Sequence, residues 1–410
     1  MQTGAGLIFC LTYAGVAIGR IPGLRLDRTG IAVLGAIAMV SGGFVPLDQA
    51  VAAIDFPTIL LLYALMVISA QFRLGGFYTR VALRVSALLR SPPLFLLAVM
   101  LASACLSAIL ANDIVCLAFT PLLVQVMRSN GYNPIPFLLG LAVSSNIGSA
   151  ATLIGNPQNM LIGQVGRLTF GPFLAFAIFP VVFSLLAGYL LIWVRYQGRL
   201  TGPAASCPEG LLPGWPPWNS WQSGKGLLAV VVLVCLFFTA IPRELSAMAV
   251  AGLLLCSRRL ESRQLLRLVD WQLLTLFCAL FVVIQGVVSS GATAAVMTLL
   301  ASHGVCFSDL LMLTGVSTVL SNLVSNVPAT MLLVKFLDPT RIQEWYTLAI
   351  SSTFAGNLVL IGSIANLIVV EQAEAMGTKV GFAEHARIGI PVTLLSLACL
   401  ALWNSLALGL

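Results

Sequence analysis

The sequence predicts an all-α polytopic membrane protein with about ten transmembrane helices and two re-entrant hairpins, arranged as two inverted repeats. The first observation is composition, because 59% of the 410 residues are hydrophobic and only 9% are charged. So little polar sequence cannot cover a soluble globule. In addition, two long apolar regions each contain a polar break near the middle, and the blocks around these breaks occur twice in the same order.

Apolar segments define a first repeat over residues 1–194. It comprises scaffold helices within 1–71, an arm at 75–90, a hairpin at 94–127, a broken helix at 137–166 and a connecting helix at 170–194. A linker at 195–225 follows. The second repeat, 226–410, comprises scaffold helices within 226–288, a hairpin at 309–337, a broken helix at 346–370 and a final helix at 388–408.

Two segments between the spans are predicted to lie at the membrane surface. The arm at 75–90 is amphipathic, with Arg80, Arg84 and Arg90 on one face, which is typical of an interfacial helix on the cytoplasmic side. An ordinary basic loop is the alternative. The linker at 195–225 contains five prolines and three tryptophans, so we expect an irregular cytoplasmic segment anchored at the headgroups.

The two hairpins are predicted from their polar tips. The regions 94–127 and 309–337 are each too long for one span, and Asn112 with Asp113 interrupts the first while Asn326 interrupts the second. A carboxylate within apolar sequence is costly in lipid, so Asp113 is expected to face protein, water or an ion. Backbone exposed at such a tip is tolerated only where protein or water covers it. We therefore expect each pair of helices to enter and leave on the same side.

Counting basic residues tests this assignment. If both hairpins return to their own side, four of the 21 basic residues fall in one set of gaps, namely Arg167, Arg243, Lys335 and Arg341, and the other 17 fall in the opposite set. This bias places the larger set in the cytoplasm and both termini outside. Because the basic residues stand singly in short gaps, the net charge of +7 indicates topology in a lipid bilayer and no nucleic-acid partner.

The repeat is visible as three blocks in each half. The first half has DFPTILLLYALMVISAQ from Asp55, LSAILANDIVCLAFTP from Leu106 and SNIGSAATLIGNPQNMLIG from Ser145; the second has DWQLLTLFCALFVVIQG from Asp270, LSNLVSNVPATMLLV from Leu320 and AGNLVLIGSIANLIVVEQ from Ala355. An odd number of spans separates the copies, so they are expected upside down relative to each other. Asp55 and Asp270 open equivalent spans and are predicted to be helix caps, not ligands.

The third block of each half carries a second kind of break, Gly-Asn-Pro at 155–157 and Gly-Ser at 362–363. Unwound backbone facing a hairpin tip offers amide dipoles to an anion and oxygens to a small cation. The alternative is that these breaks only kink helices and that the asparagines join helices together. We expect the substrate or ion to be bound by Asn112, Asp113, Asn146, Gly155, Asn156, Asn159, Ser325, Asn326, Asn357, Gly362, Ser363 and Asn366, with sodium at Asn112, Asp113 and Asn326.

The segments ANDIVCLAFTP, IGNPQN and GNLVLIGSIANLIVVE resemble the ion transporter superfamily, which includes divalent anion:sodium symporters, arsenite efflux permeases and sodium-proton antiporters. The resemblance covers essentially the whole chain. It implies a homodimer and an elevator mechanism, in which the hairpins and broken helices slide against a scaffold of the remaining spans. Symporter tips carry Ser-Asn-Thr, whereas the tips here are Ala-Asn-Asp at 111–113 and Ser-Asn-Val at 325–327, which disfavours a dicarboxylate.

The first hypothesis is a multi-pass transporter of the cell (inner) membrane that moves a small inorganic or organic anion or oxyanion. Sodium or a proton, carried by Asp113, would be the coupling ion, with no other cofactor and no catalytic residue. A second hypothesis is a sodium/proton antiporter or an arsenite-type efflux permease of the same fold. A membrane-embedded enzyme would need a nucleophile with a base or a metal cluster, for which two histidines and no CxxC give little support. A channel suits paired breaks less well than alternating access does.

Overall fold

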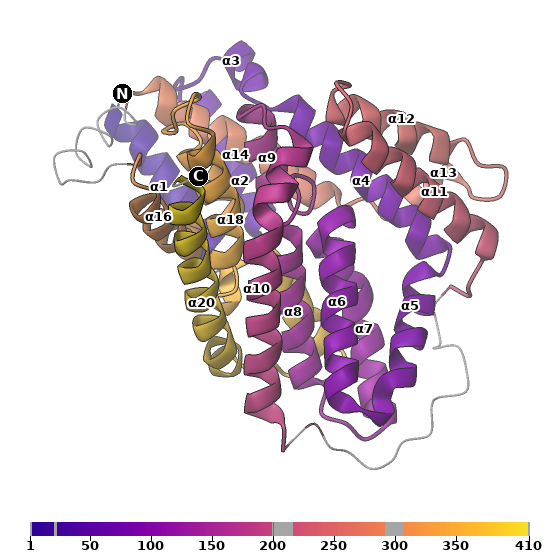
Figure 1. Ribbon diagram of the computed structural model, residues 1–410. Helices are drawn as coiled ribbons and strands as arrows, with labels where there is room; N and C mark the ends of the chain where they lie inside the picture. Colours follow the sequence, from indigo (N-terminus) through magenta and orange to yellow (C-terminus); the bar gives the residue numbers. More distant parts are fainter. Residues whose placement is uncertain (1, 20–22, 199, 201–215, 292–306, 409–410) are drawn as a thin grey trace.

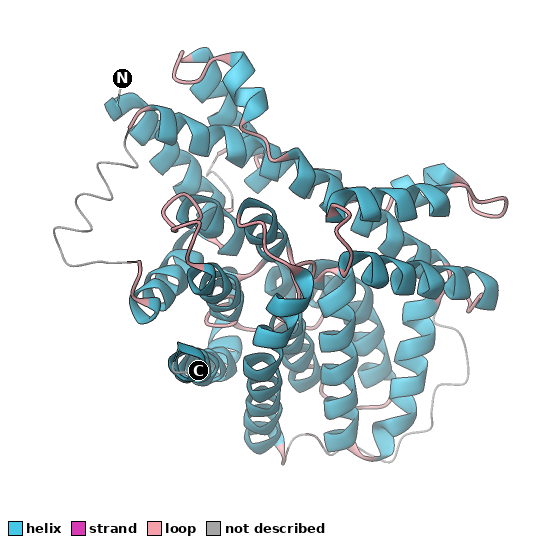
Figure 2. Ribbon diagram, turned by 45° about the horizontal axis from the view of Figure 1, so that its top comes forward, coloured by secondary structure: helices cyan, strands magenta, loops and turns pink. Residues whose placement is uncertain are grey.

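The computed structural model describes the whole chain except residues 1, 20–22, 199, 201–215, 292–306 and 409–410. The described residues form helices and connecting loops without a strand (Figure 2), which confirms the all-α class. Six helices, α4, α6, α10, α11, α14 and α20, are long and apolar enough to cross a membrane, and α1, α2, α8 and α16 are shorter apolar helices. Length and composition therefore support an integral membrane protein.

The helices form two layers, which we call the upper and the lower layer after their main positions in Figure 1. The upper layer consists of α1 (Gln2–Ile18), α2 (Arg28–Ser41), α3 (Leu47–Ala52), α4 (Phe56–Leu74), α11 (Ser220–Phe237), α12 (Arg243–Leu255), α13 (Ser262–Leu266) and α14 (Trp271–Ser289). Within it, α4 packs against α11 and α12, and α2 packs against α1 and α14.

The lower layer consists of α6 (Pro92–Leu110), α7 (Asn112–Ser129), α8 (Ile135–Ser149), α9 (Pro157–Val165), α10 (Phe170–Tyr196), α16 (Leu310–Val324), α17 (Asn326–Leu333), α18 (Ile342–Ala355), the 3-10 turn η2 (Leu360–Gly362), α19 (Ile364–Ala375) and α20 (Phe382–Leu408). In this layer α8 packs against α6 and α10, while α18 packs against α16 and α20. The long helices α10 and α20 therefore lie with the broken helices, whereas the resemblance to the ion transporter superfamily implies that they belong to the scaffold. Gly389 of α20 allows this helix to approach the chain that follows α18, because a Cβ at this position would lie 2.1 Å from Asn357 O.

The order of elements repeats between the two halves. Helices α4 and α14 have 19 residues each, and α10 and α20 have 27 residues each with one internal proline. Asp55 Oδ1 accepts a hydrogen bond from Thr58 N at 2.8 Å, and Asp270 Oδ1 accepts one from Leu273 N at 2.9 Å. The prediction that both aspartates cap helices is confirmed.

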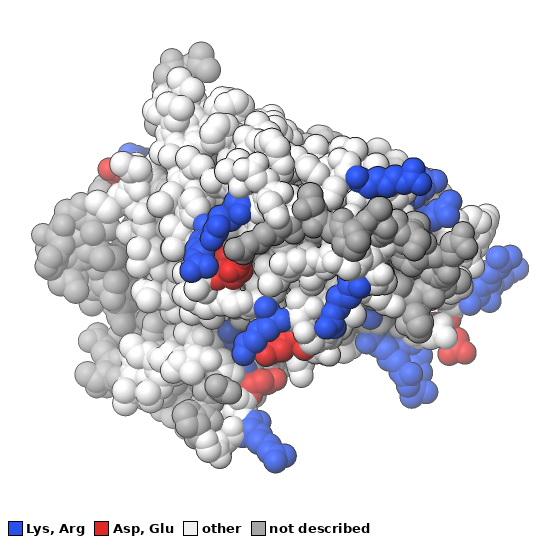
Figure 3. All heavy atoms as spheres, turned by 90° about the horizontal axis from the view of Figure 1, so that it is seen from below, with Lys and Arg blue, Asp and Glu red and all other residues white. Residues whose placement is uncertain are grey.

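Of the two segments expected at the membrane surface, the arm is helical, and the end of the expected linker is also helical. Helix α5 (Phe77–Ser86) and the 3-10 turn η1 (Ala87–Arg90) form the arm, whose three arginines are exposed while Tyr78 is buried. Lys and Arg side chains are spread over the face seen in Figure 3. Of the expected linker, residues 201–215 lie outside the described part, and α11 already begins at Ser220 because Asn219 Oδ1 accepts a hydrogen bond from Gln222 N at 3.1 Å.

Candidate functional site

Both expected hairpin tips are single residues with unusual backbone angles. Ala111, between α6 and α7, has φ 66° and ψ 134°, and Ser325, between α16 and α17, has φ 75° and ψ 157°. Among the described residues other than glycine, only Arg167 also has a positive φ. Because such angles are costly for any residue with a Cβ, the surrounding contacts must hold both tips in place. The helices of each pair pack against each other, so the chain turns back at Ala111 and at Ser325.

Replacing a tip residue by glycine is expected to remove this backbone strain. We expect Ala111→Gly and Ser325→Gly to stabilise the fold by about 1 kcal/mol each. This value is the backbone strain relieved in the folded state minus the entropy that the more flexible unfolded chain loses on folding. Thermal unfolding of the purified protein measures the effect. Ala102→Gly, inside α6, is the control and should destabilise by about 1 kcal/mol. Destabilisation by both tip variants would contradict the strained geometry.

Each tip is docked on the helix break of its own half. Asn112 N donates a hydrogen bond to Gly155 O at 3.0 Å. In the second half, one amide atom of Asn326 lies 2.7 Å from Gly362 O and 3.3 Å from Ser352 O, so this atom is the donating nitrogen. Gly155 is required for its break, because a Cβ there would lie 2.3 Å from Ser149 O.

Asn146, in α8, joins both halves of the lower layer. Its Nδ2 donates to Asn357 Oδ1 at 2.9 Å and to Asn366 Oδ1 at 3.0 Å. Its Oδ1 accepts from Asn112 Nδ2 at 2.9 Å and from Ser363 Oγ at 3.0 Å. All four hydrogen-bonding positions of this amide are therefore occupied, and they fix the first tip and the second break relative to each other.

The opposite break is held by Thr353, which lies 207 positions after Asn146, the same offset that separates Asn159 from Asn366. Thr353 Oγ1 donates to Asn159 Oδ1 at 3.3 Å and accepts from Asn156 Nδ2 at 3.2 Å. The contact between Thr353 and Asn159 thus mirrors the contact between Asn146 and Asn366. The repeat extends to the hydrogen bonds that cross between the halves.

The remaining amide groups of these asparagines donate to backbone carbonyls, two of which, Thr152 O and Gly356 O, lie in the interrupted segments. Asn159 Nδ2 donates to Thr152 O at 3.0 Å, Asn366 Nδ2 donates to Gly356 O at 2.7 Å, and Asn357 Nδ2 donates to Val143 O at 3.3 Å. Asn156 Oδ1 caps α9 by accepting from Asn159 N at 2.8 Å. Buried backbone groups need such partners where a helix is interrupted.

The two tips and the two breaks surround one small cavity, which we call the tip cavity and which has room for about one water molecule. Its lining comprises Asn112, Asp113, Pro157, Gln158, Ser325, Asn326, Val327, Ser363 and Ile364. These residues form the N-terminal ends of α7, α9, α17 and α19. The positive ends of four helix dipoles therefore converge on the same small space.

Most of these helix ends lack a capping side chain. Among the described residues, no N-cap side chain accepts a hydrogen bond from the first turn of α7, α17 or α19, whereas Asn156 caps α9. The free amide groups of a helix N-terminus bind anions. Asp113 is the only charged residue in the described lining, and no Lys or Arg contributes. The cavity thus offers amide donors for an oxyanion and one carboxylate for a cation.

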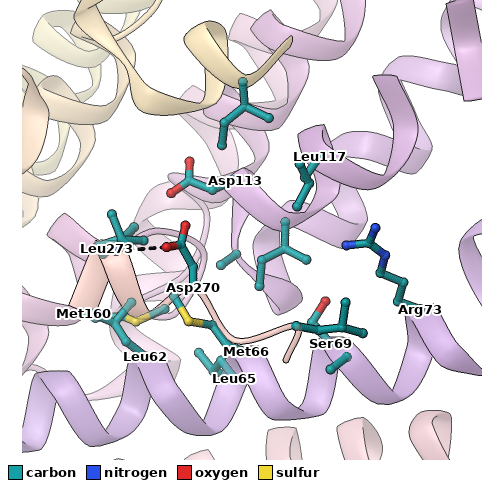
Figure 4. A pocket seen from close by; sticks show the side chains of 16 residues that line it. Leu62, Leu65, Met66, Ser69, Arg73, Asp113, Leu117, Met160, Asp270 and Leu273 are labelled. Atoms are coloured by element: carbon teal, nitrogen blue, oxygen red, sulfur yellow. Dashed lines mark hydrogen bonds between the residues drawn. The ribbon is translucent and has the colours of Figure 1, made fainter. Parts of the chain in front are cut away.

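Asp113 also lines a second cavity, between the two layers, which we call the interlayer cavity (Figure 4). This cavity is larger than the tip cavity, with room for a few water molecules, and its upper-layer wall is formed by α4 and the start of α14. Figure 4 shows the carboxylates of Asp113 and Asp270 pointing toward each other.

Of the residues predicted from the sequence, Asn112, Asp113, Ser325, Asn326 and Ser363 line the tip cavity. The others, Asn146, Gly155, Asn156, Asn159, Asn357, Gly362 and Asn366, do not line it and lie behind it in the hydrogen-bonded breaks. The predicted set lacks Pro157, Gln158, Val327 and Ile364 of the lining, and Thr353 of the network. Comparison of the two halves at the 207-residue offset could have found Thr353.

Comparisons with known proteins show that the relatives of this chain are transporters. A family model described as a citrate transporter matches residues 13–345. An uncharacterized transporter of Mycobacterium tuberculosis is 30% identical, covering 97% of this chain and 96% of that protein. The silicon efflux transporter LSI3 of Oryza sativa subsp. japonica is 27% identical and covers 91% of each. The crystal structure of the YdaH transporter of Alcanivorax borkumensis shares the fold, with a TM-score of 0.52, 16% identity and coverage of 99% and 97%.

Proposed function

We propose that this chain, which belongs to the citrate transporter family, is a secondary active transporter that moves a small oxyanion or organic anion together with, or in exchange for, sodium or protons. The resemblance to the ion transporter superfamily is confirmed by this membership. The family and the relatives are transporters and not enzymes.

The observation that carries the proposal is the convergence of four helix N-termini, three without a capping side chain, on the tip cavity. An anion held by amide groups and helix dipoles needs no arginine or lysine. The cavity is small, since its volume is that of about one water molecule. So small a space favours a small oxyanion or oxyacid over a tricarboxylate, in keeping with the name of the rice relative.

Asp113 is the proposed carrier of the coupling ion. An ionised carboxylate beside the amide groups repels an anion, whereas a proton or sodium ion on Asp113 removes that repulsion. Binding of the cation and of the anion is thereby linked. In a symporter both are carried in one direction, and in an efflux permease the cation is exchanged for the substrate.

The arrangement of layers supports an elevator mechanism. Both tips, both broken helices and the two long helices belong to the lower layer, so this layer can carry the whole tip cavity as one body. The upper layer would be the scaffold and the surface of a homodimer. In the membrane the two repeats would be inverted, with ten spans, both hairpins re-entrant and both termini outside the cell.

The alternative is a sodium/proton antiporter, in which Asp113 binds the exchanged ion and no anion is carried. Proteoliposomes distinguish the two. Sodium alone would dissipate a pH gradient in an antiporter, whereas our proposal requires an added oxyanion, with silicic acid, arsenite and citrate as probes.

The test of the proposal is a thermal-shift screen of the purified protein against the same probes, with and without sodium. A bound ligand at one hundred times its Kd should stabilise the wild type by about 2.7 kcal/mol. Asp113→Asn should lose the response to sodium and pH, because the amide can neither titrate nor neutralise a cation. Asp309→Asn, at the exposed cap of α16, is the control and should respond as the wild type does. An unchanged response in Asp113→Asn would remove this residue from the mechanism.

A further inference from the structure

Asp113 and Asp270 belong to different layers and face each other across the interlayer cavity (Figure 4). Asp113 is in the first turn of α7, next to the hairpin tip, and Asp270 precedes α14. Most other residues lining the cavity are apolar, with Leu62, Leu65 and Met66 on the wall formed by α4. Two ionised carboxylates in such surroundings repel each other strongly, because little polar material screens them.

Among the described residues, no basic side chain is paired with either acid. Arg73 of α4 is the only basic residue in the described lining, and Figure 4 shows it across the cavity from the two acids. No ion pair joins Arg73 to either carboxylate in the part of the chain that the structure describes. Asn112, beside Asp113, is only 3% exposed, and its Oδ1 has no hydrogen-bond donor among the described residues. Asn112 lines the tip cavity and not the interlayer cavity, so this acceptor faces the anion side of Asp113, where water or an ion satisfies it.

The second repeat lacks this arrangement. Asp55 is equivalent to Asp270 and caps α4 with the same geometry. At the position equivalent to Asp113, however, the second tip carries Val327, and Asp55 lines neither cavity. The acid pair is therefore not a by-product of the repeated fold. It occurs at one of two equivalent contacts.

We propose that Asp113 of the lower layer and Asp270 of the upper layer share one small monovalent cation, a proton or a sodium ion, and that the layers keep this relative position only while the cation is bound. The proposal rests on the transport function and adds Asp270 as a second residue of the coupling-ion site. Loss of the cation leaves two facing negative charges, which drives the lower layer away from α14. The coupling ion thus controls the relative position of the layers as well as the affinity for the anion.

The test is thermal unfolding of the full-length protein in detergent, without any oxyanion. At about pH 8 in N-methylglucamine chloride the wild type should melt about 3 °C or more below its Tm in sodium chloride or at about pH 5.5. The sodium arm and the pH arm identify which cation is bound. Asp270→Asn should abolish the difference by raising the Tm without cation, since asparagine caps a helix as well as aspartate does.

Asp55→Asn is the matched control, because it makes the same change at the equivalent cap, and it should keep the wild-type response. Asp270→Ser retains a capping oxygen and serves as a second variant should Asp270→Asn not fold. The proposal is overturned when Asp270→Asn responds as the wild type does, or when the wild type responds to neither sodium nor pH. If Asp270→Asn keeps the response and Asp113→Asn loses it, the proposed function stands and the shared site does not.

Discussion

Asn146→Ala is expected to destabilise the protein by about 3–5 kcal/mol and to abolish anion binding. Asn146 makes four buried hydrogen bonds, to Asn112, Asn357, Asn366 and Ser363. Alanine leaves each of these partners without its bond in a site where water does not easily replace it, and each unsatisfied buried group costs about 1–3 kcal/mol. Unfolding in denaturant measures the stability, and the thermal-shift screen measures binding.

Two further variants separate the network from simple loss of packing. Asn146→Asp keeps the acceptor for Asn112 and Ser363 but loses both donated bonds, so its defect should be of the same order. Ser184→Ala, in α10, removes a fully buried hydroxyl that has no partner in the described structure, and it should be neutral or slightly stabilising. If Asn146→Ala were no worse than Ser184→Ala, the amide network would not hold the lower layer together.

The elements that could be predicted from the sequence are those marked by a few neighbouring residues. A polar pair in an apolar run located the first tip, and Gly-Asn-Pro located the break after α8. The start of α11 was predicted wrongly, because residues up to 225 were assigned to an irregular linker, whereas the helix begins at Ser220, where Asn219 followed by Gln222 three residues later is a capping-box pattern. The short helices α3 and α13 were missed, since neither is long enough to show a hydrophobic period.

Contacts between distant segments could not be predicted in the same way. The sequence predicts the asparagines as ligands because buried amides in apolar sequence need partners, but the same need is met when they bind each other, as Asn146 and Asn366 do. The sequence predicts Asp270 only as a helix cap, and the structure confirms that it caps α14. Its second role depends on α14 lying opposite α7 across the layer boundary, and no local pattern encodes that position.

Gly148→Val should have the other largest effect, because it would separate α6 from α8. A Cβ at Gly148 would lie 2.3 Å from Ala104 Cα and 2.4 Å from Ala104 O. Both are backbone atoms, so no side-chain rotation relieves the overlap, and α6 must move away from α8. Small residues at such crossings let helix backbones approach closely in membranes. We expect a loss of about 3 kcal/mol or more in stability, with the tip at Ala111 displaced and anion binding lost.

Gly252→Ala, inside α12, is the matched control, because nothing lies within 4 Å of its added Cβ. It should stabilise the helix by up to about 1 kcal/mol, since alanine is the better helix former. The double variant Gly148→Ala with Ala104→Gly tests the geometry more directly. Removing the Ala104 side chain leaves the backbone that overlaps the added Cβ in place, so Ala104→Gly should not restore the stability that Gly148→Ala loses. A rescue would mean that α6 and α8 meet through side chains, and that the first tip is positioned by something other than this backbone contact.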